Sequence, residues 1–212
     1  ISSADDAPTA IDVDAATAAT VSIRARGCGP RTRFGVGTML GERIIVTVAH
    51  VVAGSDTVQV VGPDGRSVAA DVVWFDPDLD VAVLRSETPV GTPIELSPTA
   101  PDAGPGIVLL PRLGGEDGEV GVLDVEVVRA VTIRTTDIYR TVELERSGVE
   151  VAARLEAGDS GAMVHTPGGN SGIIWARSSE RSGRAWAVDL PDVVIDEAER
   201  LVTPVDVQRC VD

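Results

Sequence analysis

The strongest constraint on the fold is that most apolar residues fall in short segments rich in Val, Ile and Thr. Turn strings such as GCGP, AGSD and GPDG separate these segments, which is the pattern of β-strands joined by tight turns. No helical pattern alternates with the strands, so a doubly wound α/β fold is excluded. In the first half of the chain the predicted strands cover residues 21–25, 33–40, 43–48, 57–61, 67–75 and 81–85.

A second series of strands follows a Pro-rich crossing at residues 86–105. Two sets of about six short strands predict an all-β protein built from two six-stranded antiparallel β-barrels. Short helical patterns flank them, one at residues 13–19 and an amphipathic one at residues 192–202. The second series covers residues 106–110, 120–133, 138–145, 149–156, 162–166, 171–177 and 184–190.

These patterns divide the chain into four parts that together form one domain. A lead-in with a short helix (1–19) precedes the first barrel (20–95). The second barrel (96–190) precedes a C-terminal helix and tail (191–212). With 212 residues, 43% of them hydrophobic, the chain is long enough to bury a substantial core.

The charge of the chain excludes two classes of partner. All 18 basic residues are Arg, and 33 acidic residues give a formal net charge of −15. Nucleic acid is therefore not an expected partner, and an anionic membrane surface would repel the chain. No apolar run approaches the roughly 18 residues of a transmembrane helix, and no signal-peptide pattern is present. We expect that the chain does not span a membrane and is cut from a longer precursor.

Three strings carry residue types that can act together in catalysis. They are TVAHVV, DLDVAVL and EAGDSGA, which place His50, Asp80 and Ser160 in that order. A Ser hydroxyl becomes a nucleophile when an imidazole takes its proton, and a carboxylate orients that imidazole. Each string alone also fits a structural residue or an ordinary turn. Asp76 and Asp78 lie close to Asp80 in the sequence and are alternative candidates for the carboxylate that orients His50. The ordered set favours nucleophilic catalysis.

The glycines around Ser160 fit the needs of an oxyanion. A tetrahedral intermediate is stabilised by two backbone N–H groups that point at its negative oxygen. Gly158 permits a turn in which the N–H groups of residues 158 and 160 serve as these donors, and Gly161 lets the chain leave the turn tightly.

The three strings resemble the motifs of the trypsin-like serine proteases, the two-barrel chymotrypsin clan. The resemblance implies a serine endopeptidase with Ser160 as nucleophile, His50 as general base and Asp80 orienting His50, without cofactor or metal. It also implies that SGIIWAR pairs with an extended protein or peptide substrate. There Trp175 would form a pocket wall flanked by Ile174 and Ala176.

Departures from the family pattern affect specificity and activation. Arg154 stands six residues before Ser160, where trypsin has an acidic specificity residue, so a preference for basic residues is not expected. GDSGA replaces GDSGG, a small change unless Ala162 needs a positive φ. The ISSA start differs from IVGG, so insertion of the Ile1 amine against Asp159 is not expected.

The two cysteines, Cys28 and Cys210, fit either two buried thiols or a disulfide that closes almost the whole chain. The order of N-terminal helix, early Cys, triad and late Cys is similar to membrane-anchored periplasmic serine proteases of actinobacteria linked to acid resistance, as are the segments LLPRLGGEDG and TTDIYR. This likeness implies that the two cysteines pair. It also implies a periplasmic or extracellular domain whose precursor is anchored in the inner membrane.

Three expectations remain for the site. His165 follows Ser160 on a predicted strand, and we interpret it as structural. Activity should rise with pH through the titration of His50. The alternatives to a peptidase are a catalytically weak or inactive peptide-binding module and an esterase that uses the same triad, although the GxSxG pattern of α/β-hydrolases is absent.

Overall fold

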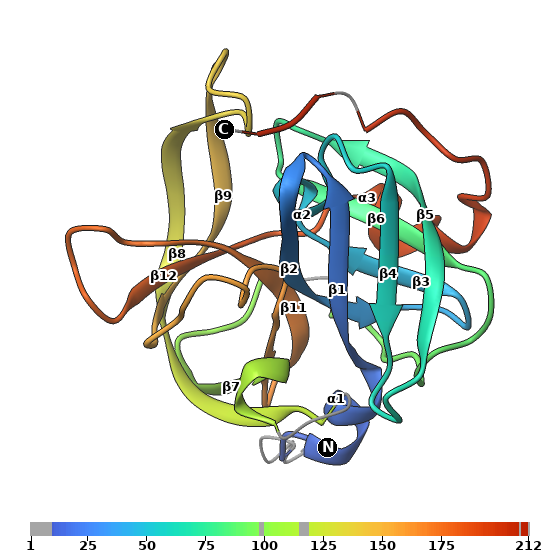
Figure 1. Cartoon of the computed structure of the whole chain (residues 1–212). Coiled ribbons are helices and arrows are strands. Elements are labelled where there is room, and N and C mark those ends of the chain that lie inside the picture. The colour runs from blue at the N-terminus through green and yellow to red at the C-terminus, as the bar shows by residue number, and fades with distance from the viewer. Residues whose placement is uncertain (1–9, 98–99, 115–118, 208, 212) are drawn as a thin grey trace.

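The computed structural model describes residues 10–97, 100–114, 119–207 and 209–211, and it confirms the two-barrel fold. Figure 1 shows the two barrels packed side by side. The first closes in the order β1-β2-β3-β6-β5-β4, and all of its paired strands are antiparallel. Its strands are β1 (Thr20–Gly27), β2 (Gly29–Met39), β3 (Ile44–Thr47), β4 (Thr57–Val61), β5 (Ser67–Asp76) and β6 (Val81–Ser86).

The second barrel closes in the order β10-β11-β12-β9-β8-β7, and its seam between β10 and β7 is the single pair His165–Ile107. A short 3₁₀ turn, η1 (Pro111–Leu113), follows its first strand. Its strands are β7 (Gly104–Leu110), β8 (Gly121–Thr136), β9 (Glu143–Ala152), β10 (Met163–Thr166), β11 (Gly169–Arg177) and β12 (Arg184–Val188).

The strands form where alternate side chains can be buried. In β1, Val21, Ile23 and Ala25 point inward and are fully buried, whereas Arg24 and Arg26 are exposed. This alternation is what one buried sheet face requires. Strand β3 departs from it, because all four of its residues are buried. In the sequence it is therefore a run of β-branched residues without alternation.

The prediction of a separate strand at residues 138–145 was wrong. The carboxylate of Asp137 accepts hydrogen bonds from the N–H and the hydroxyl of Thr141, and this closes a turn. Strand β8 therefore runs to Thr136, and β9 begins at Glu143. Their outer parts, residues 128–136 and 143–147, extend beyond the pairing with β7 and β12, and we call this ribbon with its turn the hairpin arm.

The helices are short. Helix α1 (Val13–Ala19) forms as expected, and the side chain of Asp12 caps it by accepting from the Ala15 N–H. The expected helix at 192–202 is interrupted: α3 (Asp192–Asp196) ends at Glu197, and η2 (Ala198–Arg200) follows. Asp196 and Glu197 place negative charge at the C-terminal end of α3, where the helix dipole disfavours it. In the described part of the chain, no helix is long and apolar enough to cross a membrane.

Candidate active site

His50 lies on a short helix, α2 (Ala49–Val52), directly after β3. The sequence pattern predicted a position at the end of a strand, and the helix turns the imidazole out of the barrel so that its side chain is 29% exposed. Arg33 on β2 donates hydrogen bonds to the carbonyls of His50 and Ala53, which fixes the last turn of α2. This helix anchor was not predicted, because nothing in the sequence around Arg33 marks it.

Asp80 is the carboxylate that the structure brings to His50. Its Oδ2 lies 2.8 Å from His50 Nδ1, and its Oδ1 accepts from the backbone N–H of His50 at 2.8 Å. Asp80 is 3% exposed and has a φ of 61°, a left-handed conformation that Asp tolerates better than most residues. The competing Asp76 instead accepts from the N–H groups of Asp78 and Leu79, which closes the turn before Asp80.

Ser160 lies in a turn of the second barrel that packs onto β2 of the first. Its carbonyl accepts from the N–H of Val36 at 2.8 Å, three residues along β2 from the Arg33 that holds His50. The following residue, Gly161, has a φ of 94°. A Cβ there would overlap the carbonyl of Val36 and lie 2.7 Å from the hydroxyl of Thr47, so no other residue fits this contact between the barrels.

The Ser160 hydroxyl and the His50 imidazole form no hydrogen bond among those that the described residues make. Active sites without substrate often show such a gap, which closes when substrate binds. Ala162, which replaces the usual Gly, is buried and does not adopt a positive φ. The GDSGA variant is therefore accommodated without backbone strain.

Gly158 has a φ of 100°, as a tight turn before Ser160 needs. In the described structure neither the Gly158 N–H nor the Ser160 N–H donates to a protein acceptor. Both groups are thus available to an oxyanion. The exposed residue Phe34 lies near this turn, because a Cβ on Gly158 would be 3.8 Å from the Cβ of Phe34.

The carboxylate of Asp159 pairs with Arg112 in η1. Arg112 Nε lies 2.7 Å from Asp159 Oδ1, and Asp159 Oδ2 accepts from the Glu156 N–H at 2.7 Å. Arg112 also donates to the carbonyl of Arg154. Asp159 is 1% exposed, whereas the Arg112 side chain is 28% exposed, so a partly exposed cation pairs with a buried carboxylate in the turn before Ser160. The pairing of Arg112 with Asp159 was not predicted, since the two residues lie in separate segments. The expectation about the Ile1 amine and Asp159 stays untested, because Ile1 lies outside the described residues.

The segment SGIIWAR forms β11, and Trp175 sits in a β-bulge between Ile174 and Ala176. Ile174 exchanges backbone hydrogen bonds with Gly161 and Ala162, which joins β11 to the Ser160 turn. Beyond Ile174, β11 pairs with β12 on one edge, and within the described residues its other edge has no strand partner. The side chain of Arg154 is exposed, and the structure leaves its predicted role untested.

The cysteines form a disulfide. Cys28 in the turn between β1 and β2 is bonded to Cys210 in the C-terminal tail. On the way to Cys210 the tail crosses the first barrel, where the Val205 N–H donates to Val72 and the Gly54 N–H donates to the tail at Val207.

His165, the second histidine, is fully buried in β10, and its Nδ1 lies 2.7 Å from Asn170 Oδ1. Burial lowers the pKa of His165. The partners of His165 are Asn170 and Ile107 and not residues of the Ser160 turn, which agrees with a structural role. Among the described residues no group of three or more His, Cys, Asp or Glu could hold a metal ion.

Comparison with known proteins identifies the family. Residues 35–171 match the trypsin-like peptidase domain. The chain is 28% identical to the serine protease Rv3671c of Mycobacterium tuberculosis, over the whole chain and 54% of that protein, so it spans about half the length of the curated relative.

Solved structures share the fold. The active form of the Rv3671c protease superposes with a TM-score of 0.83 at 24% identity, covering 94% of this chain and 88% of the other. The HtrA-type protease AlgW, a Ser-to-Ala variant with a tripeptide, gives 0.69 at 21% identity, covering 87% and 62%. The two barrels, the His–Asp–Ser order and the family match lead to one conclusion: the chain belongs to the trypsin-like peptidase domain family.

Proposed function

We propose that the protein is a serine endopeptidase in which Ser160, His50 and Asp80 act as a catalytic triad. The observation that carries the proposal is the double contact of Asp80 with the imidazole and the backbone N–H of His50, each at 2.8 Å. A carboxylate bonded to Nδ1 leaves Nε2 free to accept a proton from a hydroxyl. The proposal is also supported by β2, because its Val36 N–H donates to the Ser160 carbonyl and its Arg33 donates to the His50 carbonyl.

Acylation begins when Ser160 Oγ attacks the carbonyl carbon of the scissile peptide bond. His50 Nε2 takes the hydroxyl proton, and Asp80 stabilises the imidazolium that results. The intermediate expels the amine, which receives the proton from His50, and an acyl-enzyme remains. Water then attacks the ester carbonyl while His50 takes a proton from the water, which gives a second tetrahedral intermediate. Collapse of this intermediate releases the acid, and His50 returns the proton to Ser160.

Two backbone N–H groups, those of Gly158 and Ser160, would bind the oxyanion. Their support comes from the Arg112–Asp159 pair beneath the turn and from the Gly161 contact with β2. Because these contacts exist before substrate binds, the donors need little reorganisation in the transition state.

The substrate is proposed to be an extended protein or peptide. The edge of β11 at residues 175–176 offers unpaired backbone to a substrate strand, with Trp175 as a wall and Ile174 and Ala176 beside it. Arg154 is exposed and forms no ion pair among the described residues, so a basic residue at the cleaved position is not expected.

An extracytoplasmic location, periplasmic or extracellular, is supported by the Cys28–Cys210 disulfide, because such bonds persist in oxidising compartments. A precursor anchored in the membrane would be consistent with that location.

Cleavage of a diverse peptide library, followed by mass spectrometry, tests the proposal. We expect internal cleavage by the wild type and none by Ser160→Ala, since that change removes the nucleophile while leaving the fold intact. A folded wild type that binds peptides without cleaving them would favour the inactive binding module instead. Cleavage of short esters alone does not discriminate, because serine peptidases and esterases share it.

A further inference from the structure

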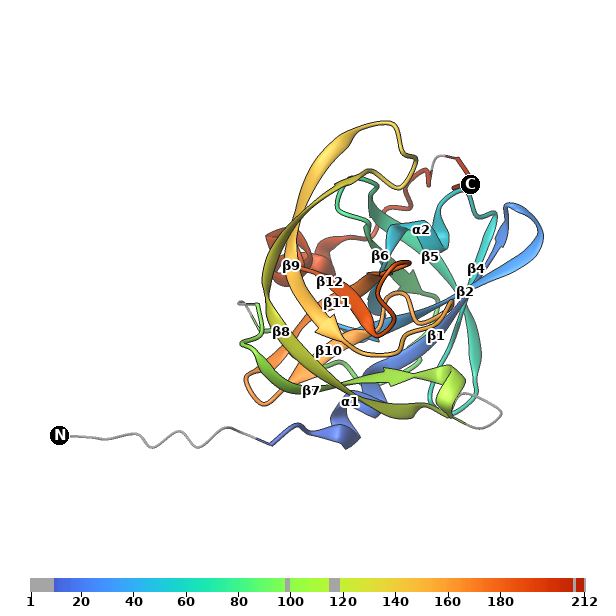
Figure 2. The same ribbon diagram turned by 90° about the vertical axis from the view of Figure 1, so that its left-hand side faces the viewer.

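Arg146 is a buried cation at the boundary between the two barrels. It lies on β9 at the base of the hairpin arm and is only 2% exposed. Arg is rarely buried to this degree unless its charge is paired. Figures 1 and 2 show the hairpin arm rising beside the first barrel, with its tip near the C-terminal tail.

The guanidinium of Arg146 holds backbone from both barrels. Its Nε donates to the carbonyl of Asp78 at 2.7 Å, in the turn that leads to Asp80. Its Nη2 donates to the carbonyl of Thr136 in the hairpin arm at 3.1 Å. The same group lies over the ring of Trp175, 4.5 Å from the centroid, which is a cation–π distance. Arg146 thus contacts the Asp80 turn and the proposed substrate strand at once.

The charge of Arg146 has no ion-pair partner among the described carboxylates, whereas four of them surround it at longer range. Asp80 has the largest electrostatic effect on Arg146, followed by Asp76 and Asp78 of the same turn and Asp137 of the hairpin arm. Trp175 faces it from β11. Burial lowers the pKa of Arg146 and the carboxylates oppose that effect. The cation therefore acts on Asp80 through the interior rather than through a direct contact.

We propose that Arg146 is a positioning residue that fixes the Asp80 turn against Trp175 and partly offsets the charge of Asp80 behind His50. This inference rests on the triad proposed above and goes beyond it. A guanidinium that donates to the Asp78 carbonyl restrains the backbone two residues before Asp80. Its positive charge opposes the negative charge of Asp80, so a variant that lacks this charge should favour the protonated imidazole more strongly.

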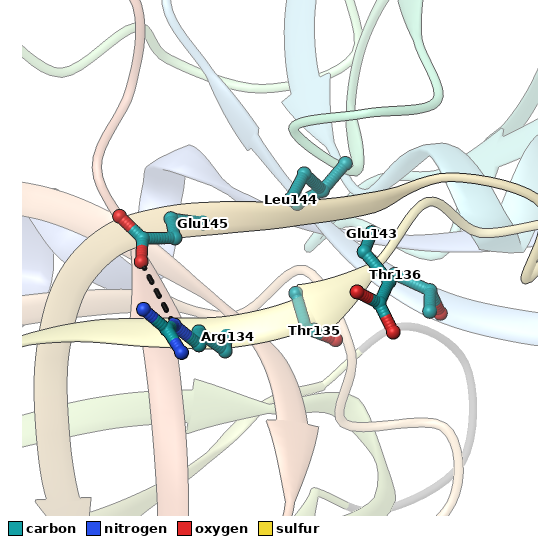
Figure 3. Close-up of a pocket in the computed structure, with 6 residues that line it drawn as sticks. All are labelled: Arg134, Thr135, Thr136, Glu143, Leu144 and Glu145. Atoms are coloured by element: carbon teal, nitrogen blue, oxygen red, sulfur yellow. Dashed lines mark hydrogen bonds and ion pairs between the residues drawn. The ribbon is translucent and has the colours of Figure 1, made fainter.

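Three variants separate charge from hydrogen bonding. Arg146→Met removes the charge and the hydrogen bonds. Arg146→Gln removes the charge but retains an amide that can donate to one carbonyl, so it replaces the Met variant in the test if that variant does not fold. Arg146→Lys retains the charge but loses the planar guanidinium that donates to two carbonyls at once. The matched control is Arg134→Met, which removes an Arg from the same hairpin arm. Figure 3 shows Arg134 paired with Glu145. The two nitrogen and oxygen atoms lie 3.1 Å apart, and the groove of about 560 Å³ beside them contains none of the predicted site residues.

The measurement is the rate of Ser160 labelling by a fluorophosphonate as a function of pH, per folded molecule. In the Met and Gln variants we expect the acid limb of the profile to move up by about half a pH unit. The labelling rate above that limb should fall about tenfold in the Met variant, because the Asp80 turn is less restrained. Arg146→Lys should keep the limb of the wild type, and Arg134→Met should keep both limb and rate.

A folded neutral variant with the acid limb of the wild type would overturn the proposal, as would an equal shift in Arg134→Met. The triad is tested separately by the same assay. If labelling of the wild type does not require His50, the proposed function fails; if it does and the limb of the neutral variants is unmoved, only the role of Arg146 fails.

Discussion

At the scale of single residues, Gly161 joins the proposed nucleophile to the other barrel. A Cβ at this position would overlap the carbonyl of Val36, and the φ of 94° disfavours any L side chain. We expect Gly161→Ala to lower the free energy of unfolding by more than about 2 kcal/mol and to reduce fluorophosphonate labelling at least tenfold. Chemical denaturation and labelling rates measure the two effects.

The control for this prediction is Gly183→Ala. Gly183 has a similar φ of 81°, but no atom lies within 4 Å of the added Cβ. Only the backbone strain remains there, roughly 1 kcal/mol, and labelling should not change. If the two variants lose equal stability, the contact between the Ser160 turn and β2 is not as tight as described.

Arg112 gives a second prediction for a single residue. Arg112→Met leaves the carboxylate of Asp159 buried without its cation, and we expect a loss of about 2–4 kcal/mol of stability. The turn that carries Gly158 and Ser160 should loosen, so kcat should fall more than KM rises. Thermal unfolding and steady-state kinetics check this, with Arg134→Met as an exposed-pair control that should cost less than about 1 kcal/mol. Wild-type kcat in a folded Arg112→Met would contradict it.

Residue patterns predicted part of this site because its chemistry is local. The strings around His50, Asp80 and Ser160 each carry a side chain together with the turn or strand that presents it. Arg33, Arg112 and Arg146 act on backbone or carboxylates far away in the chain. An Arg that makes such a contact looks like any other Arg in the sequence, so these contacts could be found only in the folded chain.

At the scale of elements, β10 closes the second barrel through His165, which is fully buried and paired with Ile107. Burial lowers the pKa of His165, so between its ordinary value, about 6.5, and the lower folded value the unfolded chain binds more protons than the folded one. Stability contributed by the neutral form is therefore present above this window and lost as pH falls through it.

We expect His165→Gln to reduce this acid sensitivity, because the Gln amide can still donate to Asn170 but does not titrate. Urea unfolding at a series of pH values between about 7 and 5 measures the slope in both proteins. Parallel slopes would show that protonation of His165 does not contribute to acid destabilisation.

The strands were predicted more accurately than the helices, for a physical reason. Alternation of apolar and polar residues marks strands such as β1 in the sequence, and strand β4 at Thr57–Val61 matches its predicted bounds. Two short helical features had no such signal: His50 was expected at the end of the strand 43–48 but lies on α2, and α3 ends early at Glu197. A helix of one or two turns is set by its tertiary contacts rather than by periodicity.

At the scale of the whole molecule, the disulfide ties the first hairpin to the C-terminal tail. Cys28 and Cys210 are 182 residues apart, so the bond restricts nearly the entire unfolded chain. We expect the double variant Cys28→Ser, Cys210→Ser to lose about 2–5 kcal/mol, seen as a drop in Tm. Reductant should lower the Tm of the wild type similarly and leave that of the double variant unchanged. Equal Tm values for the wild type and the double variant would mean that the noncovalent contacts of the C-terminal tail are sufficient and that the disulfide adds no stability.

The residues of the proposed site come from both barrels and lie on opposite sides of the boundary between them. His50 and Asp80 belong to the first barrel, and Ser160 belongs to the second. The measurement that tests this account most directly is the intact mass of the protein after treatment with a fluorophosphonate, beside Ser160→Ala and His50→Ala. We predict one adduct on Ser160 in the wild type, none in Ser160→Ala, and labelling slowed by at least 100-fold in His50→Ala. A folded wild type that takes no adduct, or one that His50→Ala labels equally fast, would contradict the proposed triad.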